Sequence, residues 1–345
     1  MGEYHIKGGR RICGEIPING AKNAILPILA SVVLNPGVSV IHNCPKISDT
    51  KVSVDILRAI GCKVNEEGKT LIIDAGGVNV SDVPADLVKE MRSSFIFLGG
   101  VLGRLGRVKI CKPGGCELGE RAVDLHLSGL AKLGVKVCDE DGVIECTADK
   151  ITGCRINLSF PSVGATENLM LAGIYGEGET IISNAAKEPE IVDLQNFLNI
   201  CGAKVKGAGT TEIVVTGVKK LHDGEYTVMP DRIVAGTYLV ASAITNGEIT
   251  LNNIEKEHLY PITDKLMETG CKINFTGKSV TLTAPDGRLK AIDELITNPH
   301  PGFPTDMQPQ FVTLLSIASG TSIITETIFN ERDKHIYQLK QMGAD

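Results

Sequence analysis

One short pattern, the end of an amphipathic helix followed by a glycine and then a strand, occurs five times in this chain. It is anchored by Gly61, Gly134, Gly202, Gly270 and Gly343, and successive copies lie about 70 residues apart. A glycine just beyond a helix is typical of the left-handed conformation that closes its last turn. Five copies at near-constant spacing therefore predict a fold built from a repeated unit.

A second pattern lies between these glycines: a short extended segment, a turn, and a helix that is apolar along most of its length. It occurs at residues 14–34, 157–175, 226–244 and 298–318. Helices of this kind belong inside a domain, where other elements cover them. Strand-like segments lie at residues 70–76, 212–218 and 279–285. The repeated unit is therefore expected to be an α/β module, with several modules packed around their inner helices in each of roughly two domains.

The fifth copy of the first pattern lies at the end of the printed sequence. The first four glycines are followed by a strand, whereas Gly343 is followed only by Ala344 and Asp345. If the units come in equal sets of three, a sixth unit is also missing. The expectation is a chain that is short by about 70 residues, or one repeat.

Composition excludes several classes of protein. The net charge of −6 argues against a general nucleic-acid binder, so any anion site must be a local cluster of Lys and Arg. No run approaches 18 apolar residues and the N-terminus has no apolar signal region, so neither a membrane span nor secretion is expected. Ten cysteines with no CxxC pair and no zinc-type spacing favour a reducing cytoplasm, with no disulfide framework and no metal.

Residues 113–130, PGGCELGERAVDLHLSGL, carry the strongest chemical signal. Cys116 lies on a glycine-built loop, where a thiol is available for chemistry, and Arg121, Asp124 and His126 follow it. The guanidinium of Arg121 suits phosphate or carboxylate. The segment predicts a positioned thiol that meets an anionic substrate. The alternative is a common glycine turn before an amphipathic helix, with a core cysteine.

This stretch, together with NGAKNAILPILA, SVGATENLMLA, NAAKEPEIVD, PDRIVAGTYLVA and PHPGFPTDMQPQF, resembles the UDP-N-acetylglucosamine 1-carboxyvinyltransferases, a family of enolpyruvyl transferases. The motifs occur in family order along all 345 residues. The resemblance implies a two-domain inside-out α/β barrel fold of repeated βαβαββ-type units, with its last part missing. Residues 1–21 and 231–345 would form one domain, discontinuous and incomplete, and residues 22–230 the other, which carries the Cys116 loop.

The resemblance also implies a reaction. The enolpyruvyl group of phosphoenolpyruvate would be transferred to the 3′-hydroxyl of UDP-N-acetylglucosamine through a tetrahedral ketal, with release of phosphate. This is the first committed step of peptidoglycan synthesis and takes place in the cytoplasm. The partners would be these two small molecules, with no cofactor, metal, nucleic acid or membrane.

Three residues would carry the catalysis that the resemblance implies. Cys116 would be the general acid and could form a covalent adduct with the enolpyruvyl group, because a thiol is mostly protonated at neutral pH. Asp306 would accept the proton of the 3′-hydroxyl, and Lys22 would hold phosphoenolpyruvate. The structural alternatives are a turn or N-cap aspartate and a solvated lysine at a helix start.

Further residues of the family motifs would bind the two substrates. Ser162 would otherwise be an ordinary N-cap and Arg92 a surface helix arginine, and Glu188 and Glu190 are expected only to begin a helix. The full substrate-binding set implied by the resemblance is Lys22, Asn23, Arg92, Arg121, Ala122, Val123, Asp124, Leu125, Ser162, Val163, Gly164, Asp306, Ile328 and Arg332.

Two departures and two alternative functions accompany this interpretation. Ala122 stands where most members have proline, and Phe160-Pro161 stands where some have a lysine. The first alternative is the sister 3-phosphoshikimate enolpyruvyl transferase. The Cys116 loop argues against it, as do residues 121–125, which the resemblance implies bind the uridine. The second is a non-catalytic UDP-sugar-binding remnant. Alkylation by fosfomycin, which modifies this cysteine in the family, is expected at Cys116.

Overall fold

The computed structural model describes residue 5 and residues 7–112 and 123–344. Contacts within the chain divide it into two units, one formed by Met1–Asn19 with Pro230–Asp345 (unit 1) and one formed by Gly20–Met229 (unit 2). The chain therefore passes between the units after Asn19 and after Met229, whereas the family resemblance implied boundaries after residues 21 and 230. Each unit is described here by itself.

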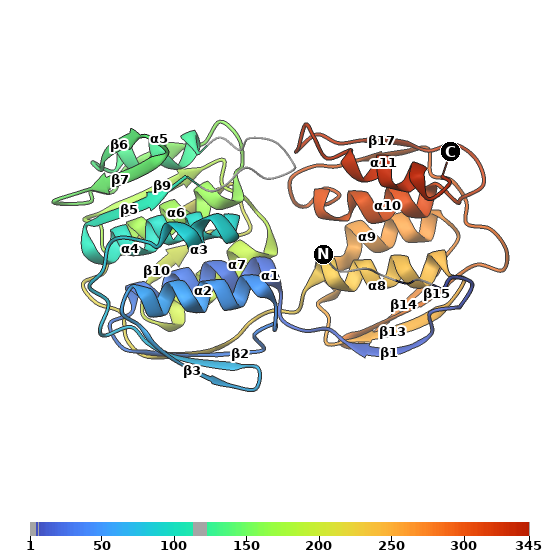
Figure 1. Ribbon diagram of the computed structural model, residues 1–345, viewed down its shortest axis with the longest axis horizontal. Coiled ribbons are helices and arrows are strands. Elements are labelled where there is room, and N and C mark those ends of the chain that lie inside the picture. Colours follow the sequence, from blue (N-terminus) through green and yellow to red (C-terminus); the bar gives the residue numbers. More distant parts are fainter. Residues whose placement is uncertain (1–4, 6, 113–122, 345) are drawn as a thin grey trace. The chain divides into compact units, whose positions relative to one another are not determined.

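Three sheets form the outer layers of unit 2 (Figure 1), and their strand orders are β12-β2-β4-β3, β5-β7-β6 and β10-β11-β9-β8. The β12–β2 and β8–β9 pairs are parallel and the remaining pairs are antiparallel. The strands are β2 Val38–His42, β3 Lys63–Glu67, β4 Thr70–Asp74, β5 Arg107–Cys111, β6 Lys136–Glu140, β7 Val143–Thr147, β8 Arg155–Asn157, β9 Glu179–Ser183, β10 Lys204–Lys206, β11 Glu212–Thr216 and β12 Gly224–Thr227.

Helices alternate with these strands in unit 2. Three inner helices, α1, α4 and α6, each precede a strand, an outer helix and a hairpin, which is the repeated module expected from the sequence. Helix α4 packs against both α1 and α6. The helices are α1 Lys22–Ser31, η1 Val32–Leu34, α2 Ser48–Ala59, α3 Ala85–Glu90, η2 Arg92–Ile96, α4 Phe97–Leu105, α5 Asp124–Lys132, α6 Val163–Gly173 and α7 Pro189–Ile200, where η marks a 3-10 helix.

Unit 1 repeats the same module. Its four-stranded sheet has the order β1-β13-β15-β14, and β16 pairs with β17 in parallel. The elements are β1 Gly14–Pro17, α8 Arg232–Ile244, β13 Glu248–Asn252, α9 Lys256–Glu268, β14 Lys272–Thr276, β15 Ser279–Thr283, β16 Glu294–Ile296, η3 Thr305–Met307, α10 Gln308–Leu315, β17 Ile323–Thr325 and α11 Lys334–Gln341. The strand-like segments of the sequence correspond to β4, β11 and β15.

The five repeat glycines all lie just beyond outer helices, as the sequence predicts. Gly61, Gly134, Gly202, Gly270 and Gly343 have φ values of 110°, 87°, 95°, 98° and 95°. Side chains rarely adopt this left-handed region, so glycine is the residue that can end each helix there. The strands β3, β6, β10 and β14 follow the first four glycines.

The inner helices differ in how much of their own surface is buried. Every residue of α6 from Ala165 to Gly173 is buried, and α1 is buried from Ala24 onward, as expected for covered helices. The same expectation is wrong for α8 and α10, which bury one side only: Val234 and Tyr238 of α8 are 41% and 38% exposed. In the described part of unit 1, α8 packs against α10 and against strands β13 and β15 of the sheet.

A Gly100→Ala variant is expected to destabilise unit 2. A Cβ atom at Gly100 on α4 would lie 2.4 Å from the backbone oxygen of Ala30 on α1. No side-chain movement can relieve this clash, because the contacted atom belongs to the backbone. Overpacking of this kind lowers the free energy of unfolding by about 1–3 kcal/mol. Urea denaturation followed by circular dichroism would measure it. Gly8→Ala is the control because no atom lies within 4 Å of its Cβ, and equal loss in both variants would contradict the close-packing argument.

Candidate functional site

Two segments that the sequence marks for UDP-sugar binding lie together in unit 2. Val123, Asp124 and Leu125 begin α5, and Ser162, Val163 and Gly164 begin α6. The two helices pack against each other, and a Cβ atom at Gly164 would lie 3.0 Å from Cε1 of His126. Ser162 is the N-cap of α6, since its side chain accepts a hydrogen bond of 3.3 Å from the Ala165 N–H. A capped helix start beside a second helix start can hold an anion.

Arg92 lies on an element that contacts the same helices. It begins η2, whose Phe95 ring meets the His126 ring edge to face at 5.1 Å between centroids, and η2 also packs against α6. Arg92 is half-buried, which differs from the structural alternative of a surface helix arginine. Within the described residues, its buried Nη1 atom has no hydrogen-bond partner. A buried, unsatisfied guanidinium nitrogen suits an anionic ligand.

Lys22 begins α1, as the alternative structural interpretation expected. Its Nζ atom lies 2.8 Å from Oδ2 of Asp49 on α2, and the lysine side chain is 49% exposed. The neighbouring Asn23 is exposed. The sequence did not single out Asp49, whose place in the first turn of α2 is common for a carboxylate. Such a partly exposed ion pair is worth up to about 1 kcal/mol, so a phosphate or carboxylate can compete for the lysine.

Asp306, Ile328 and Arg332 come together in unit 1, although only the family motifs linked them. Arg332 Nη1 lies 3.1 Å from Oδ1 of Asp306 and donates to Thr305 Oγ1 at 3.2 Å. Asp306 lies in η3, and its side chain is 41% exposed whereas that of Arg332 is 12% exposed. The exposed carboxylate can therefore accept a proton, while the arginine is held beneath it.

Glu326 is the residue that organises this cluster, and sequence reasoning missed it. Its Oε1 accepts hydrogen bonds from the Ile328 N–H (2.7 Å) and the Phe329 N–H (3.0 Å), and its Oε2 accepts from Thr305 Oγ1 (2.9 Å). The guanidinium of Arg332 lies over the Phe329 ring, 5.5 Å from its centroid. Glu326 thus fixes the turn that carries Ile328 and the hydroxyl that contacts Arg332. The only sequence signal was an acidic residue before a turn.

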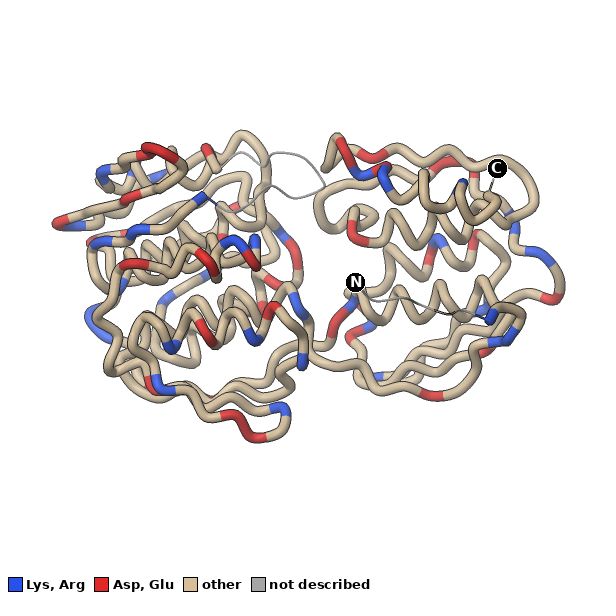
Figure 2. Tube along the Cα trace, viewed as in Figure 1, with Lys and Arg blue, Asp and Glu red and all other residues tan. Residues whose placement is uncertain are grey.

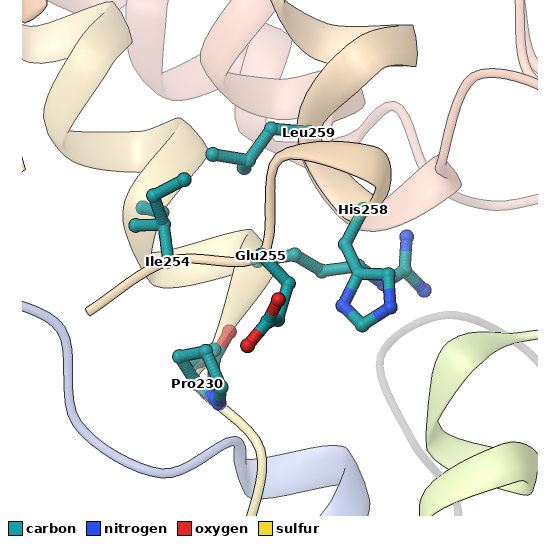
Figure 3. A pocket seen from close by; sticks show the side chains of 8 residues that line it. Pro230, Ile254, Glu255, His258 and Leu259 are labelled. Carbon is teal, nitrogen blue, oxygen red and sulfur yellow. The ribbon is translucent and has the colours of Figure 1, made fainter. Parts of the chain in front are cut away.

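A separate small pocket in unit 1 is lined in part by Pro230, the residue at which the chain enters unit 1 again (Figure 3). It is lined by Pro230, Asp231, Arg232, Ala235, Ile254, Glu255, His258 and Leu259. Ile254 and Leu259 form one wall, and the Glu255 carboxylate points toward Pro230. Asp231 caps α8 by accepting from the N–H groups of Ile233 (2.8 Å) and Val234 (2.9 Å). None of the residues assigned a role from sequence lines this pocket.

Two titratable groups, the half-buried His126 and the buried Glu167, lie close to the helix starts of unit 2. Burial lowers the pKa of His126 to about 4, so the imidazole is neutral at pH 7. Glu167 on α6 is 5% exposed, and burial, with the negative charges of Glu190 and Glu188, raises its pKa well above the usual range. Glu188 and Glu190 begin α7 as expected. Sequence reasoning did not anticipate the buried Glu167 beside them.

Replacing Glu167 with glutamine is expected to stabilise the protein increasingly as pH rises. The pKa of Glu167 is higher in the folded protein than in the unfolded chain. Its contribution to the free energy of unfolding is therefore largest at pH values below the unfolded pKa, and it falls as pH rises toward the folded pKa. Glutamine does not titrate, so the stability difference between variant and wild type should grow by up to about 1.4 kcal/mol per pH unit between pH 5 and 7. Urea denaturation across this range would measure it, with the exposed Glu67→Gln as control. Parallel profiles for wild type and Glu167→Gln would contradict the assignment.

Charged residues of both signs are distributed over the described part of each unit. Figure 2 shows Lys and Arg interspersed with Asp and Glu in both units. Among the described residues, no group of three His, Cys, Asp or Glu side chains is placed to hold a metal ion. None of the helices in the described ranges is long and apolar enough to cross a membrane. Cys116, Arg121 and Ala122, which the sequence marked as functional, lie outside the described residues.

Comparisons with known proteins agree on one family. The family model described as EPSP synthase (3-phosphoshikimate 1-carboxyvinyltransferase) matches residues 6–345. A protein of Caldanaerobacter subterraneus named UDP-N-acetylglucosamine 1-carboxyvinyltransferase 2 is 54% identical over 345 residues, 100% of this chain and 82% of that protein. A protein of Symbiobacterium thermophilum named UDP-N-acetylglucosamine 1-carboxyvinyltransferase 1 is 51% identical over 348 residues, 99% of this chain and 78% of that protein.

Solved structures show the same fold. The enolpyruvyl transferase NikO from Streptomyces tendae superposes with a TM-score of 0.87 at 25% identity, covering 96% of this chain and 79% of that chain. The EPSP synthase from Acinetobacter baumannii superposes with a TM-score of 0.72 at 18% identity, covering 98% of this chain and 80% of that chain. The second likeness supports the fold alone. The expected enolpyruvyl transferase fold is thereby confirmed.

Proposed function

Since this chain belongs to the EPSP synthase family, we propose that it transfers the enolpyruvyl group of phosphoenolpyruvate to the 3′-hydroxyl of UDP-N-acetylglucosamine and releases phosphate. The observation that carries this proposal is the 54% identity, along the whole chain, to a protein named UDP-N-acetylglucosamine 1-carboxyvinyltransferase 2. The geometry within each unit supports it, because unit 2 carries groups suited to anions, such as the buried Nη1 of Arg92, and unit 1 carries the exposed Asp306 carboxylate beside Arg332.

Asp306 is the base in this proposal. Its carboxylate removes the proton from the 3′-hydroxyl, so that the sugar oxygen can bond to C2 of phosphoenolpyruvate. Its exposed position and its contact of 3.1 Å with Arg332 support the role. The arginine holds the carboxylate in one orientation and offers a charge to the anionic substrate. Ile328, on the turn fixed by Glu326, contacts the sugar.

Cys116 is the general acid. It gives its proton to C3 of phosphoenolpyruvate while the sugar oxygen bonds to C2, which forms a tetrahedral ketal. Elimination then breaks the bond between C2 and the phosphate oxygen, which leaves as phosphate, while a C3 proton returns to the Cys116 thiolate formed in the addition. Lys22, Asn23 and Arg92 bind the phosphoenolpyruvate phosphate and carboxylate, for which the buried unsatisfied nitrogen of Arg92 is support.

The UDP-sugar is held by the starts of α5 and α6. Ser162, Val163 and Gly164 bind the diphosphate through a hydroxyl and backbone N–H groups at a helix start. The uridine is bound by residues 121–125, which are Arg121, Ala122, Val123, Asp124 and Leu125. We further propose a cytoplasmic enzyme that supplies peptidoglycan synthesis, because the name of the relatives specifies carboxyvinyl transfer with UDP-N-acetylglucosamine.

The test is phosphate release from phosphoenolpyruvate with UDP-N-acetylglucosamine or shikimate 3-phosphate as acceptor. We expect release only with the UDP-sugar, and a product whose mass exceeds the acceptor by one enolpyruvyl group. Release with shikimate 3-phosphate alone would favour the sister activity. Tight UDP-sugar binding without release from either acceptor would favour the non-catalytic remnant.

A further inference from the structure

A hydrogen-bond relay fixes the proton position on His126, a residue to which the proposed reaction assigns no role. Asn168 on α6 accepts a hydrogen bond of 2.6 Å at Oδ1 from the Gly99 N–H. Its Nδ2 atom lies 3.2 Å from the Phe95 carbonyl oxygen and 2.9 Å from Nδ1 of His126. A backbone N–H can only donate and a carbonyl can only accept, so both backbone contacts determine which way the amide points.

The orientation of Asn168 determines the tautomer of His126. Because Asn168 Nδ2 is a donor, the Nδ1 atom of His126 must accept, and the neutral ring therefore carries its proton on Nε2. Across residues 5, 7–112 and 123–344, Nε2 has no hydrogen-bond partner. His126 is thus a neutral side chain with one donor of fixed position.

That donor lies beside the start of α6. A Cβ atom at Gly164 would lie 3.0 Å from Cε1 and 3.4 Å from Nε2 of His126, so the Nε2 edge of the ring borders Gly164. The ring cannot turn easily, because Phe95 packs edge to face against it with an interplanar angle of 72°. A side chain at position 164 would crowd the imidazole, and a ligand at the first turn of α6 would meet the Nε2–H group.

We propose that His126 is a substrate-binding residue that donates a hydrogen bond from Nε2 to a phosphoryl oxygen of the nucleoside diphosphate, and that Asn168 is the positioning residue that keeps the proton on Nε2. The inference rests on the proposed function for the identity of the ligand. If the proton were on Nδ1, the Nε2 lone pair would face a phosphoryl oxygen, which would repel it. Asn168 prevents this from 2.9 Å away without touching the substrate.

The first experiment needs no variant. Long-range ¹H–¹⁵N correlation spectra of the histidine rings at pH 7 should show the His126 proton on Nε2. In Asn168→Asp the carboxylate can accept but not donate, so the proton should move to Nδ1. A wild-type ring protonated on Nδ1 would overturn the relay, and a purely structural Asn168 would not change the tautomer.

The second experiment separates binding from turnover. His126→Ala should raise the KM for UDP-N-acetylglucosamine by about 10–100-fold, the value of a hydrogen bond to a charged group, with kcat and the phosphoenolpyruvate KM within about 3-fold. His126→Gln, which keeps an N–H donor, should recover part of this loss. Asn168→Asp should resemble His126→Ala although its imidazole is present. The control is His222→Ala, because His222 is exposed in the same unit and bonds the Asp223 carbonyl.

Failure of this inference differs from failure of the proposed function. An active wild type whose His126→Ala variant keeps its KM for the UDP-sugar would overturn the role of His126 alone. If the wild type releases no phosphate, calorimetric binding of UDP decides: weaker binding in His126→Ala supports the diphosphate contact, and equal binding overturns it. Thermal melting identifies variants that fail to fold, and the wild-type tautomer remains a test in that case.

Discussion

An Asp306→Asn variant is expected to lose about 10²–10⁴-fold in kcat, with both KM values within a few fold of wild type. The amide has the size of the carboxylate, and its oxygen can still accept the hydrogen bond from Arg332 Nη1, which now lies 3.1 Å from Oδ1. It cannot accept a proton at neutral pH, so the 3′-hydroxyl would lose its base. Steady-state phosphate release at saturating concentrations of both substrates would measure the change.

Glu331→Gln provides the matched control for this prediction. Its side chain is 56% exposed and its carboxylate pairs with Lys334 at 3.3 Å. It directly precedes Arg332 in sequence but lies outside the cluster that Glu326 organises. We expect this variant to keep its kcat. A similar loss in both variants would point to general charge effects, and full activity of Asp306→Asn would remove Asp306 from the chemistry.

The repeat architecture was predictable because it depends on local signals. Each repeat glycine follows an amphipathic helix and adopts a positive φ, and this combination is visible in one chain without alignment. Helix α4 was not among the four inner helices identified from sequence. Its Gly99, Gly100 and Gly103 lower helix propensity, yet they allow the backbones of α1 and α6 to approach within contact distance. A feature that weakens the local signal is thus required by the tertiary packing.

In the candidate site too, some residues could be predicted from their neighbours in sequence, whereas others depend on partners that are distant in sequence. Ser162 as an N-cap and Glu188 at the start of α7 follow from neighbouring residues. Glu326 and Asn168 do not, because their partners at Thr305 and His126 come from other elements of the fold. No periodicity or propensity indicates which acidic or amide side chain will meet a distant partner. Residues that orient the functional groups were therefore missed, whereas the residues within the motifs were found.

A Cys116→Ala variant is expected to lose at least about 10²-fold in kcat, because the enol carbon then has no proton donor. Cys116→Asp should retain measurable turnover, since a carboxylic acid can still donate a proton. The same aspartate variant should resist fosfomycin, because it has no thiol to be alkylated. Turnover measurements with and without fosfomycin would separate the two properties.

Peptide mapping after fosfomycin treatment tests the identity of the thiol against the other cysteines. Burial raises the pKa of Cys44 and Cys62 to about 12 and that of Cys146 and Cys201 to about 11, so these four thiols hold almost no thiolate at neutral pH. Cys13 and Cys138 are both exposed, but desolvation and the negative charge of Glu140 raise the pKa of the Cys138 thiol, so Cys13 is the competitor to test. We expect the adduct on Cys116 in wild type and in Cys13→Ser, and no adduct in Cys116→Asp. An adduct that persists in Cys116→Asp and disappears in Cys13→Ser would show that accessibility, and not an activated position in a substrate site, selects the reactive thiol.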